Sequence, residues 1–349
     1  MTPLKLAVIG GGHLGRFHTR LAAEMPQIEL VGVADPSDAA RGKLAEEFGV
    51  RAVADYHELL GDVEAAVIAA PTKLHHQIGL DLLAAGKHLL MEKPLAPTAD
   101  ECGDLVEAAE AHDLVLQVGH VEQFNPALDS AMPQLGTPRY IEATRLGGFT
   151  GRSTDIGVVL DMMIHDIDLV LSMVDAPVAR VDAIGATVLG GHEDLANARV
   201  TFGDGTVATF NASRVSFKAQ RTMHIWCEDG FASIDFAAHK GCLIKPTASL
   251  LSGELDIESL TASERKQFQE TLFDDVLPVD WFQATAGNAL QEELADLVDA
   301  VRTPRPPRVD GRQGWAAVAL AEQILTAIDQ QSAAQPPRIL PDSRWDRAA

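Results

Sequence analysis

The sequence predicts a doubly wound parallel α/β domain followed by an α+β domain with a large, mostly antiparallel open sheet. Over the first 120 residues, short apolar runs alternate with amphipathic helical patterns, which is typical of βαβ units. A glycine-rich turn joins the first run to the first helical pattern. Beyond Pro138, strand-like segments follow one another, and the pairs Asp204-Gly205 and Asp229-Gly230 indicate tight hairpins. The length of 349 residues suits about two domains.

The N-terminal domain is predicted to span residues 1–120. Its strands are expected as continuous apolar runs, because helices cover a parallel sheet on both faces. Such runs occur at Leu4–Ile9, Ile28–Ala34, Ala65–Ala70, His88–Met91 and Leu114–Val118. The helical segments between them are His13–Met25, Asp38–Phe48, Leu74–Ala85 and Ala99–His112. Thr98 and Glu101 predict a capping box at the start of the last helix.

The α+β domain is predicted over residues 121–331, with a Pro- and Ala-rich tail over residues 332–349. Its strand-like segments are Arg139–Leu146, Val178–Leu189, Ala196–Phe202, Thr206–Arg214, Thr222–Glu228, Ala232–Phe236 and Cys242–Ile244. One long helical segment, Val158–Val174, interrupts them. An acidic, irregular excursion is expected at Leu251–Trp281, followed by helices near Ala286–Arg302 and Gln313–Gln331.

Composition and charge limit the possible partners. Fifty acidic residues against 28 basic ones give a formal charge of −22, which repels phosphate backbones and anionic lipids. Neither nucleic acid nor a membrane is therefore expected as a partner. The three cysteines, Cys102, Cys227 and Cys242, have neither the spacing of a metal site nor the even number of a disulfide framework. Because the sequence also lacks a long apolar run and a signal-peptide layout, a cytoplasmic protein is expected.

The turn Gly10-Gly11-Gly12-His13-Leu14-Gly15 follows the first predicted strand and begins the first predicted helix. Gly10 permits a tight turn, Gly12 lets the backbone approach a diphosphate, and Gly15 lets the helix pack on the strand. The N–H groups at the helix N-terminus can then bind the anion without basic side chains. This explains how so acidic a chain could bind a dinucleotide.

Asp35 follows the second predicted strand, 20 residues beyond Gly15. A carboxylate at this spacing accepts hydrogen bonds from the ribose hydroxyls of NAD and repels the 2′-phosphate of NADP. NAD is therefore the predicted cofactor; Arg41, further along the chain, keeps NADP as a less favoured alternative. The alternative to a cofactor site is a turn needed only for packing, with Asp35 capping the next helix.

A candidate catalytic lysine follows the fourth apolar run, in the segment Met91-Glu92-Lys93-Pro94. The carboxyl edge of a doubly wound sheet is where its ligands bind, so Lys93 could reach a substrate hydroxyl beside a nicotinamide ring. Pro94 restricts the preceding residue to extended backbone. The alternative is a solvated surface lysine, which is the commoner environment.

Asp161, His165 and Asp168 share one face of the predicted helix Val158–Val174, while Ile164 and Ile167 lie on the neighbouring face. A histidine oriented by a carboxylate suits removal of a hydroxyl proton, since histidine titrates near neutral pH. Two alternatives stay open. One is an intrahelical ion pair without chemistry, and the other is a metal site, for which no further ligand cluster has a recognisable spacing.

These features resemble the glucose-fructose oxidoreductase / inositol dehydrogenase / rhizopine-catabolism (Gfo/Idh/MocA) family of oxidoreductases over nearly the whole chain. The segments that carry the resemblance are the glycine turn, Ala70-Pro71-Thr72 through His75, Glu92-Lys93-Pro94, and Asp161 through Asp168. The resemblance implies a Rossmann domain joined to an α+β domain whose open sheet mediates oligomerisation. A homo-oligomer, a dimer or a tetramer, is therefore expected.

The resemblance also implies roles for single residues. Lys93, Asp161 and His165 match the catalytic trio of the family. The cofactor-contacting positions are matched by Gly10, Gly12, His13, Leu14, Asp35, Pro71, His75, Glu92 and Lys93. Gln123 departs from the family pattern, because many members carry Arg at this position.

Within the family, the chain resembles UDP-N-acetylglucosamine 3-dehydrogenase-type enzymes. Arg145 and Arg152 could form a fork for a substrate diphosphate, or they could form ordinary ion pairs. Together with Lys93, Asp161 and His165 they make up the predicted substrate-binding set. The implied function is NAD-dependent oxidation of a secondary hydroxyl on a sugar or nucleotide-sugar, such as C3 of UDP-N-acetylglucosamine. An inositol, polyol or free-aldose dehydrogenase is an alternative, and so is a non-catalytic NAD-binding sensor.

Overall fold

The computed structural model describes residues 2–151, 156–253, 256–285, 287–303 and 305–334. It divides into two compact units. Of the described residues, those between 2 and 124 and between 288 and 323 form the first unit, and those between 125 and 287 and between 324 and 334 form the second. Each unit is built around one sheet.

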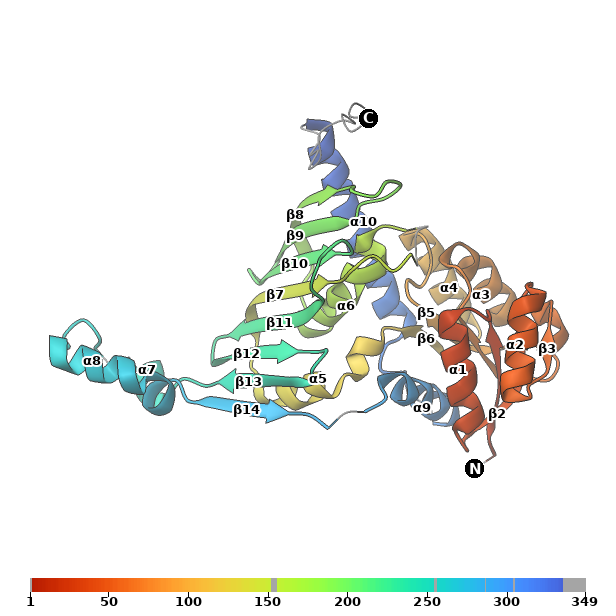
Figure 1. Ribbon diagram of the computed structural model, residues 1–349, viewed down its shortest axis with the longest axis horizontal. Helices are drawn as coiled ribbons and strands as arrows, with labels where there is room; N and C mark the ends of the chain where they lie inside the picture. The colour runs from red at the N-terminus through yellow and green to blue at the C-terminus, as the bar shows by residue number, and fades with distance from the viewer. Residues whose placement is uncertain (1, 152–155, 254–255, 286, 304, 335–349) are drawn as a thin grey trace, which may run out of the picture. The chain divides into compact units, whose positions relative to one another are not determined.

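A six-stranded parallel sheet forms the centre of the first unit (Figure 1), which confirms the predicted doubly wound domain. Its strands are β1 (Leu4–Ile9), β2 (Ile28–Ala34), β3 (Ala52–Val53), β4 (Ala65–Ile68), β5 (His88–Glu92) and β6 (Leu116–Gly119), in the order β3-β2-β1-β4-β5-β6. The helices between them are α1 (His13–Glu24), α2 (Asp38–Phe48), α3 (His75–Ala84) and α4 (Ala99–Ala111). Strand β3 was not predicted, because two residues are too few to show a pattern.

Local sequence signals begin and end these helices. Ser37 caps α2 through its side chain, and Gly49 ends that helix in the left-handed conformation. Thr98 caps α4 as predicted, since its hydroxyl oxygen accepts a hydrogen bond from the N–H of Glu101 at 3.3 Å. The strands are apolar on both faces, and all four residues of β4 are fully buried.

The first unit also includes helix α9 (Ala289–Arg302) and residues 311–323 of helix α10 (Gly311–Ala334). Residues 121–331 were expected to form one second domain, so the grouping of α9 and part of α10 with the first unit differs from the expectation. The physical reason is the apolar stripe of α9, where Leu294, Leu297 and Val298 join the same buried cluster as Leu4 and Leu6 of β1. The period of the stripe predicts a helix, but it does not indicate which sheet the helix covers.

An eight-stranded sheet forms the second unit (Figure 1). Its strands are β7 (Pro138–Leu146), β8 (Val178–Ala186), β9 (Leu195–Phe202), β10 (Val207–Ser213), β11 (Gln220–Cys227), β12 (Gly230–Asp235), β13 (Lys240–Ile244) and β14 (Val279–Gln283). The order is β14-β13-β12-β11-β7-β10-β9-β8. All neighbouring pairs are antiparallel except β7 and β10, which confirms the predicted mostly antiparallel sheet.

The two faces of this sheet differ. Along β7, Ile141, Ala143 and Arg145 are buried on the face against which helices α5 (Pro126–Ala131) and α6 (Ile164–Met173) pack. Half-buried aromatic rings lie on the alternate positions. The ring centroids of Tyr140 and Trp226 are 5.0 Å apart, and those of Trp226 and Phe231 are 4.9 Å apart.

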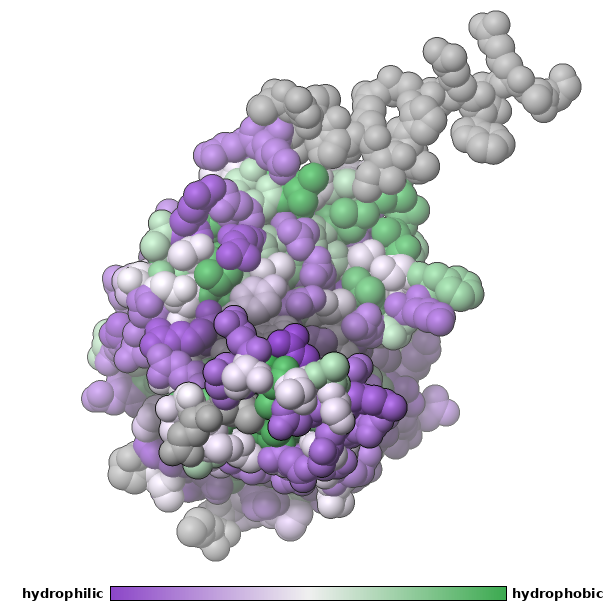
Figure 2. Space-filling model, turned by 90° about the vertical axis from the view of Figure 1, so that its left-hand side faces the viewer, coloured by the Kyte–Doolittle hydropathy of each residue, from purple (hydrophilic) through white to green (hydrophobic). Residues whose placement is uncertain are grey.

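The segment between β13 and β14 contains α7 (Ala248–Leu251), α8 (Ala262–Thr271) and the π-helical turn η6 (Leu272–Val276), in none of which a residue is buried. Figure 2 faces this segment and shows mostly hydrophilic side chains with hydrophobic ones among them. The predicted irregular excursion is therefore partly helical. Its end forms β14, in which Trp281 pairs with Cys242 of β13 and is 76% exposed.

The predicted helix Val158–Val174 begins with a π-helical turn, η5 (Val159–Met163), before α6 follows. Near the end of the chain, α10 continues to Ala334, and the rest of the predicted tail lies outside the described residues. In the described part of the chain, no helix is both long and apolar enough to cross a membrane.

Glu293 on α9 is a fully buried carboxyl group in the first unit. Its backbone oxygen accepts a hydrogen bond of 2.9 Å from Nε2 of Gln117, but neither carboxyl oxygen has a hydrogen-bond partner among the described residues. Burial raises the pKa of Glu293 well above 4.5, and the negative charges of Glu92 and Asp296 raise it further. The protonated form is therefore favoured in the folded protein.

Replacing Glu293 by Gln is expected to remove a pH-dependent loss of stability. Because the folded-state pKa is raised, this group contributes stability that is complete below about pH 4.5 and is lost as the pH rises through the folded-state pKa. The free energy of unfolding of Glu293→Gln should exceed that of the parent by about 1–4 kcal/mol at pH 8 and be similar at pH 4.5. Urea unfolding at both pH values measures this difference. The exposed neighbour provides the control Glu292→Gln; equal pH dependence in all three proteins would contradict the assignment.

Candidate active site

The glycine turn between β1 and α1 has the geometry that its sequence predicts. Gly10 has a φ of +103°, and a Cβ atom there would lie 2.6 Å from the carbonyl oxygen of Ala69. A Cβ atom at Gly15 would overlap the carbonyl oxygen of Gly10. At Gly12, by contrast, the described residues other than its own chain neighbours place no atom within 4 Å of the Cβ position. Gly10 and Gly15 are thus required by the fold, whereas Gly12 leaves open space at the helix N-terminus.

The N-terminus of α1 can receive an anion. Its N-cap, Gly12, has no side chain to accept the first N–H groups, and the first turn contains no acidic residue. His13 and Leu14 are exposed in this turn, and Leu14 is 40% exposed. Free N–H groups and the positive end of a 12-residue helix therefore face the open space at Gly12. This fits the diphosphate of a dinucleotide.

Asp35, which follows β2, lies against the same turn. One carboxylate oxygen accepts a 2.7 Å hydrogen bond from the N–H of Gly11, and the other accepts one of 2.7 Å from the N–H of Ser37. Arg41 donates to the carbonyl oxygen of Asp35 at 2.7 Å and pairs with Asp38. A cavity of about 560 Å³ is lined by Gly11, Ala40, Lys43 and Leu44, among others. The negative charge at Asp35 suits ribose hydroxyls better than a 2′-phosphate.

His75 connects the loops that follow β4 and β5. The side chain is 1% exposed. Its Nδ1 lies 2.9 Å from the carbonyl oxygen of Pro94, and its Nε2 lies 2.9 Å from that of Ala70. Carbonyl oxygens only accept, so both bonds form together only when the ring carries both protons. The ring thus links the segment that contains Pro71 to the segment that contains Lys93. A direct contact of Pro71 or His75 with the cofactor stays a prediction.

Glu92, the last residue of β5, is buried beside α1. Its Oε1 lies 2.8 Å from Nε2 of His18, which is fully buried. A Cβ atom at Gly119 of β6 would lie 3.1 Å from Oε2 of Glu92, so the missing side chain leaves room for the carboxylate. His18 was not among the predicted site residues. The signal was available, because a histidine three residues after Gly15 lies on the apolar face of the helix.

Lys93 follows Glu92 at the carboxyl end of β5 and is half-buried. Burial, and after it the positive charge of Lys93, lowers the pKa of His120 to about 3, so the His120 ring stays neutral. The ammonium group therefore lies close to a buried imidazole at the edge of the sheet. This environment disfavours the alternative of a solvated surface lysine.

The second unit contains the other two predicted catalytic residues. Asp161 lies in η5 and His165 in α6, and both side chains are half-buried, while Asp168 is 2% exposed. Ile164 and Ile167 are fully buried, as predicted for the neighbouring face. Among the described residues, no three His, Cys, Asp or Glu side chains form a cluster that could hold a metal ion.

Of the two arginines that were predicted to bind the substrate, the structure describes only one. Arg145 of β7 is 4% exposed, and its Nη2 and Nε donate to the carboxylate of Asp166 at 2.8 and 3.1 Å. Of its two predicted roles, the structure favours the ion pair. Arg152 lies outside the described residues. Gln123 is 5% exposed in the 3-10 helical turn η3 (Val121–Phe124) of the first unit.

Comparison with known families matches both parts of the chain. Residues 4–120 match the oxidoreductase family model with an NAD-binding Rossmann fold, and residues 130–233 match the Gfo/Idh/MocA C-terminal domain. The chain is 33% identical over 315 residues to UDP-N-acetylglucosamine 3-dehydrogenase of Acidithiobacillus ferrooxidans, covering 90% of this chain and 94% of that protein. It is 29% identical over 234 residues to scyllo-inositol 2-dehydrogenase (NAD(+)) of Bacillus subtilis, covering 61% and 68%.

Solved structures agree with this assignment. A structure of the Acidithiobacillus ferrooxidans enzyme has a TM-score of 0.83 at 32% identity and covers 95% of this chain and 99% of that one. Levoglucosan dehydrogenase in complex with NADH has a TM-score of 0.78 at 18% identity, covers 95% and 98%, and shows the shared fold. The chain is therefore an NAD-binding oxidoreductase that belongs to the Gfo/Idh/MocA family.

Proposed function

We propose that the protein oxidises a secondary hydroxyl group of a nucleotide-sugar with NAD, at C3 of UDP-N-acetylglucosamine. The observation that carries the proposal is the half-buried Lys93 at the carboxyl edge of the sheet that also presents the open N-terminus of α1. Ligands of doubly wound sheets bind along this edge. The choice of sugar is supported by 33% identity over 90% of the chain to a UDP-N-acetylglucosamine 3-dehydrogenase.

The residues at the glycine turn fit the cofactor. The N–H groups of Gly12, His13 and Leu14 would hold the diphosphate, and Asp35 would accept hydrogen bonds from the adenosine ribose. Bound NAD supplies the acceptor for the hydride that leaves the carbinol carbon. The chain itself then has to hold the sugar and remove the hydroxyl proton.

In the proposed mechanism, Lys93, Asp161 and His165 act on one carbinol. His165 takes the hydroxyl proton as the C–H bond gives up its hydride. Lys93 donates a hydrogen bond to the same oxygen and stabilises the negative charge that develops there. Asp161 orients the His165 imidazole. Lys93 belongs to the first unit and the other two residues to the second, so their meeting at one substrate is part of the proposal.

Two other functions make different experimental predictions. An inositol, polyol or free-aldose dehydrogenase is supported by the similarity to scyllo-inositol 2-dehydrogenase. A non-catalytic NAD-binding sensor would keep the fold without the chemistry. The half-buried position of Lys93 favours catalysis, because a sensor has no need to desolvate an ammonium group.

We also propose a homo-oligomer in the cytoplasm, assembled through the sheet face that carries Tyr140, Trp226 and Phe231. These half-buried rings form one aromatic cluster on the face opposite α5 and α6, and a second copy offers the same cluster to a twofold contact.

Sedimentation should show a dimer or tetramer that Trp226→Glu dissociates. Lys266→Glu, on exposed α8, is the control. A monomeric parent protein would contradict the proposal.

Replacing Lys93 by Met should lower turnover about 10²–10³-fold while the dissociation constant for NAD changes little, because the lost group stabilises charge on the substrate oxygen. Turnover is followed by NADH absorbance with UDP-N-acetylglucosamine, inositol and free sugars, and NAD binding by calorimetry. Lys266→Met is the control, since this lysine is exposed on α8. Unchanged turnover in Lys93→Met would refute the role of Lys93. A parent protein that binds NAD but oxidises no sugar would favour the sensor.

Replacing Asp35 by Asn should weaken NAD binding about 10-fold and narrow the preference for NAD over NADP, because the variant loses the charge that repels a 2′-phosphate. Dissociation constants for both cofactors, measured by calorimetry, test this. Glu29→Gln, an exposed position on β2, is the control. A ratio of NAD to NADP affinity equal to that of the parent would exclude Asp35 as the determinant.

A further inference from the structure

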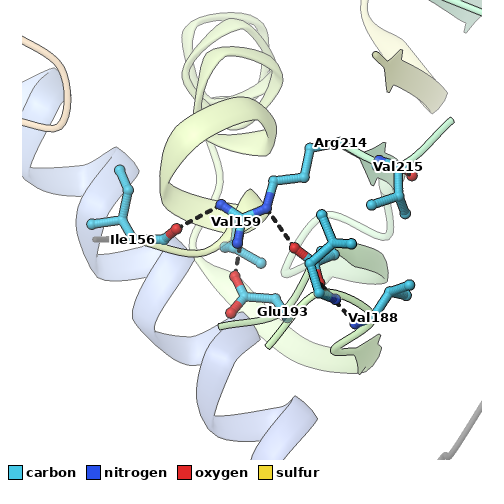
Figure 3. Close-up of polar contacts among 9 residues, drawn as sticks. Ile156, Val159, Val188, Glu193, Arg214 and Val215 are labelled. Atoms are coloured by element: carbon cyan, nitrogen blue, oxygen red, sulfur yellow. Dashed lines mark hydrogen bonds and ion pairs between the residues drawn. The ribbon is translucent and has the colours of Figure 1, made fainter. Parts of the chain in front are cut away.

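The helix that carries Asp161 and His165 is capped by a distant residue. Its first residues, Val158 and Val159, have no side chain that could cap their own N–H groups. The N–H of Val158 donates to the backbone oxygen of Glu193 at 2.9 Å. The N–H of Val159 donates to Oε1 of Glu193 at 3.0 Å, and both of these residues are drawn in Figure 3. Glu193 lies 34 residues further along the chain than Val159, in the loop between β8 and β9.

Gly157 provides the space for the Glu193 carboxylate. A Cβ atom on this buried glycine would overlap both carboxylate oxygens and the carboxyl carbon of Glu193. The carbonyl oxygen of Gly157 accepts a 3.0 Å hydrogen bond from the N–H of Asp161. Gly157, which leaves room for the Glu193 carboxylate, is thus hydrogen-bonded to the backbone of Asp161, a proposed catalytic residue.

Asp194 and Arg214 hold the loop that carries Glu193. Nε of Arg214 donates to Oδ1 of Asp194 at 2.7 Å. Its Nη1 donates to the carbonyl oxygen of Ile156 at 2.8 Å (Figure 3). Oδ2 of Asp194 accepts hydrogen bonds from the N–H groups of Val188 and Leu189 at 2.7 and 2.6 Å. Burial opposes ionisation of Asp194, but the Leu189 N–H and the Arg214 guanidinium hold its pKa below the usual value.

We propose that Glu193 is a positioning residue for the reaction, which fixes the helix of Asp161 and His165 through its carboxylate. The inference rests on the proposed function, because it assigns a use to those two residues. The Glu193 carboxylate accepts from the N–H of Val159, and the Glu193 backbone oxygen accepts from the N–H of Val158, so both N–H groups are satisfied. The negative charge of the carboxylate also suits the positive end of the helix. Without it, the first turn can fray, and both side chains lose their fixed direction.

The test compares two substitutions that remove a carboxylate cap from a helix of the second unit. Glu193→Ala removes the cap of η5. Glu264→Ala removes the carboxylate half of the capping box of α8, in which Oε2 of Glu264 accepts from the N–H of Thr261 at 2.8 Å; no candidate residue lies on this helix. Glu193→Ala should lower kcat about 10–100-fold with the KM for NAD nearly unchanged. Glu264→Ala should leave kcat unchanged.

A conservative variant and a second substitution separate positioning from general damage. Glu193→Gln keeps an oxygen for the Val159 N–H and should recover kcat to within about 3-fold of the parent. Gly157→Ala, which displaces the carboxylate, should reproduce the effect of Glu193→Ala. Thermal unfolding confirms that each variant is folded. A kcat for Glu193→Ala that equals that of Glu264→Ala would overturn the proposal.

A readout without substrate distinguishes this inference from the proposed function. The imidazole signals of His165, assigned by NMR with the variant His165→Gln, should shift in Glu193→Ala and stay in place in Glu264→Ala. If the parent oxidises no sugar, the proposed function fails while this measurement still decides the inference. Unchanged His165 signals in Glu193→Ala would refute the positioning role, whatever the substrate.

Discussion

The placement of Lys93 in the first unit depends on the contacts that the Glu92 carboxylate makes. This carboxylate joins α1 through His18, it fits over β6 because Gly119 has no side chain, and it immediately precedes Lys93. A buried carboxylate is costly unless it is paired, and His18 provides the partner. Glu293 lies near enough for the negative charge of Glu92 to raise its pKa, so a proton on Glu293 avoids a second negative charge in the same core. The buried contacts of Glu92 therefore fix the end of β5, from which the loop that carries Lys93 begins.

The backbone N–H groups of the glycine turn explain how an acidic chain can bind an anionic cofactor. The formal charge of −22 excludes a field of basic side chains as the means of attraction. Two buried arginines of the second unit, Arg145 and Arg214, form ion pairs with Asp166 and Asp194. At the glycine turn, backbone N–H groups provide the positive potential. This potential acts over a short distance and does not depend on the net charge of the chain. Under the proposed function, Asp35 beside the turn would select against a further phosphate.

Local patterns predicted the parts of the fold that local interactions determine. The five longer strands of the first sheet, the glycine turn and the Thr98 cap all follow from residues that are close in sequence. The rest depends on distant partners. The apolar stripe of α9 predicts a helix but not its sheet, and β7 pairs with β10 in parallel only after α6 and two strands have intervened. Such a pairing has no signature within either strand.

The candidate site residues also differ in whether nearby sequence or distant partners determine their positions. The positions of Lys93 and Asp35 at strand ends could be predicted, because a strand boundary is a local feature. The partner of Arg145 could not, since Asp166 is 21 residues away and on another element. In the first unit, His18 contacts a residue 74 positions away, and in the second unit, Glu193 contacts one 34 positions away. No spacing rule connects residues that meet only after the sheet and the helices have packed.

The two units place their candidate catalytic residues by the same physical means. In each, a carboxylate is fitted against a glycine, Glu92 against Gly119 and Glu193 against Gly157. In each, it is hydrogen-bonded to a different element from its own, and a proposed catalytic residue follows the contact closely in the chain. A charged hydrogen bond is stronger and more directional than apolar packing, so it limits rotation as well as distance. Proton and hydride transfer demand that precision, because a displacement of about 1 Å can cost a 10²-fold loss of rate. In each unit, the glycine thus contributes to the placement of a candidate residue, because it leaves room for the carboxylate.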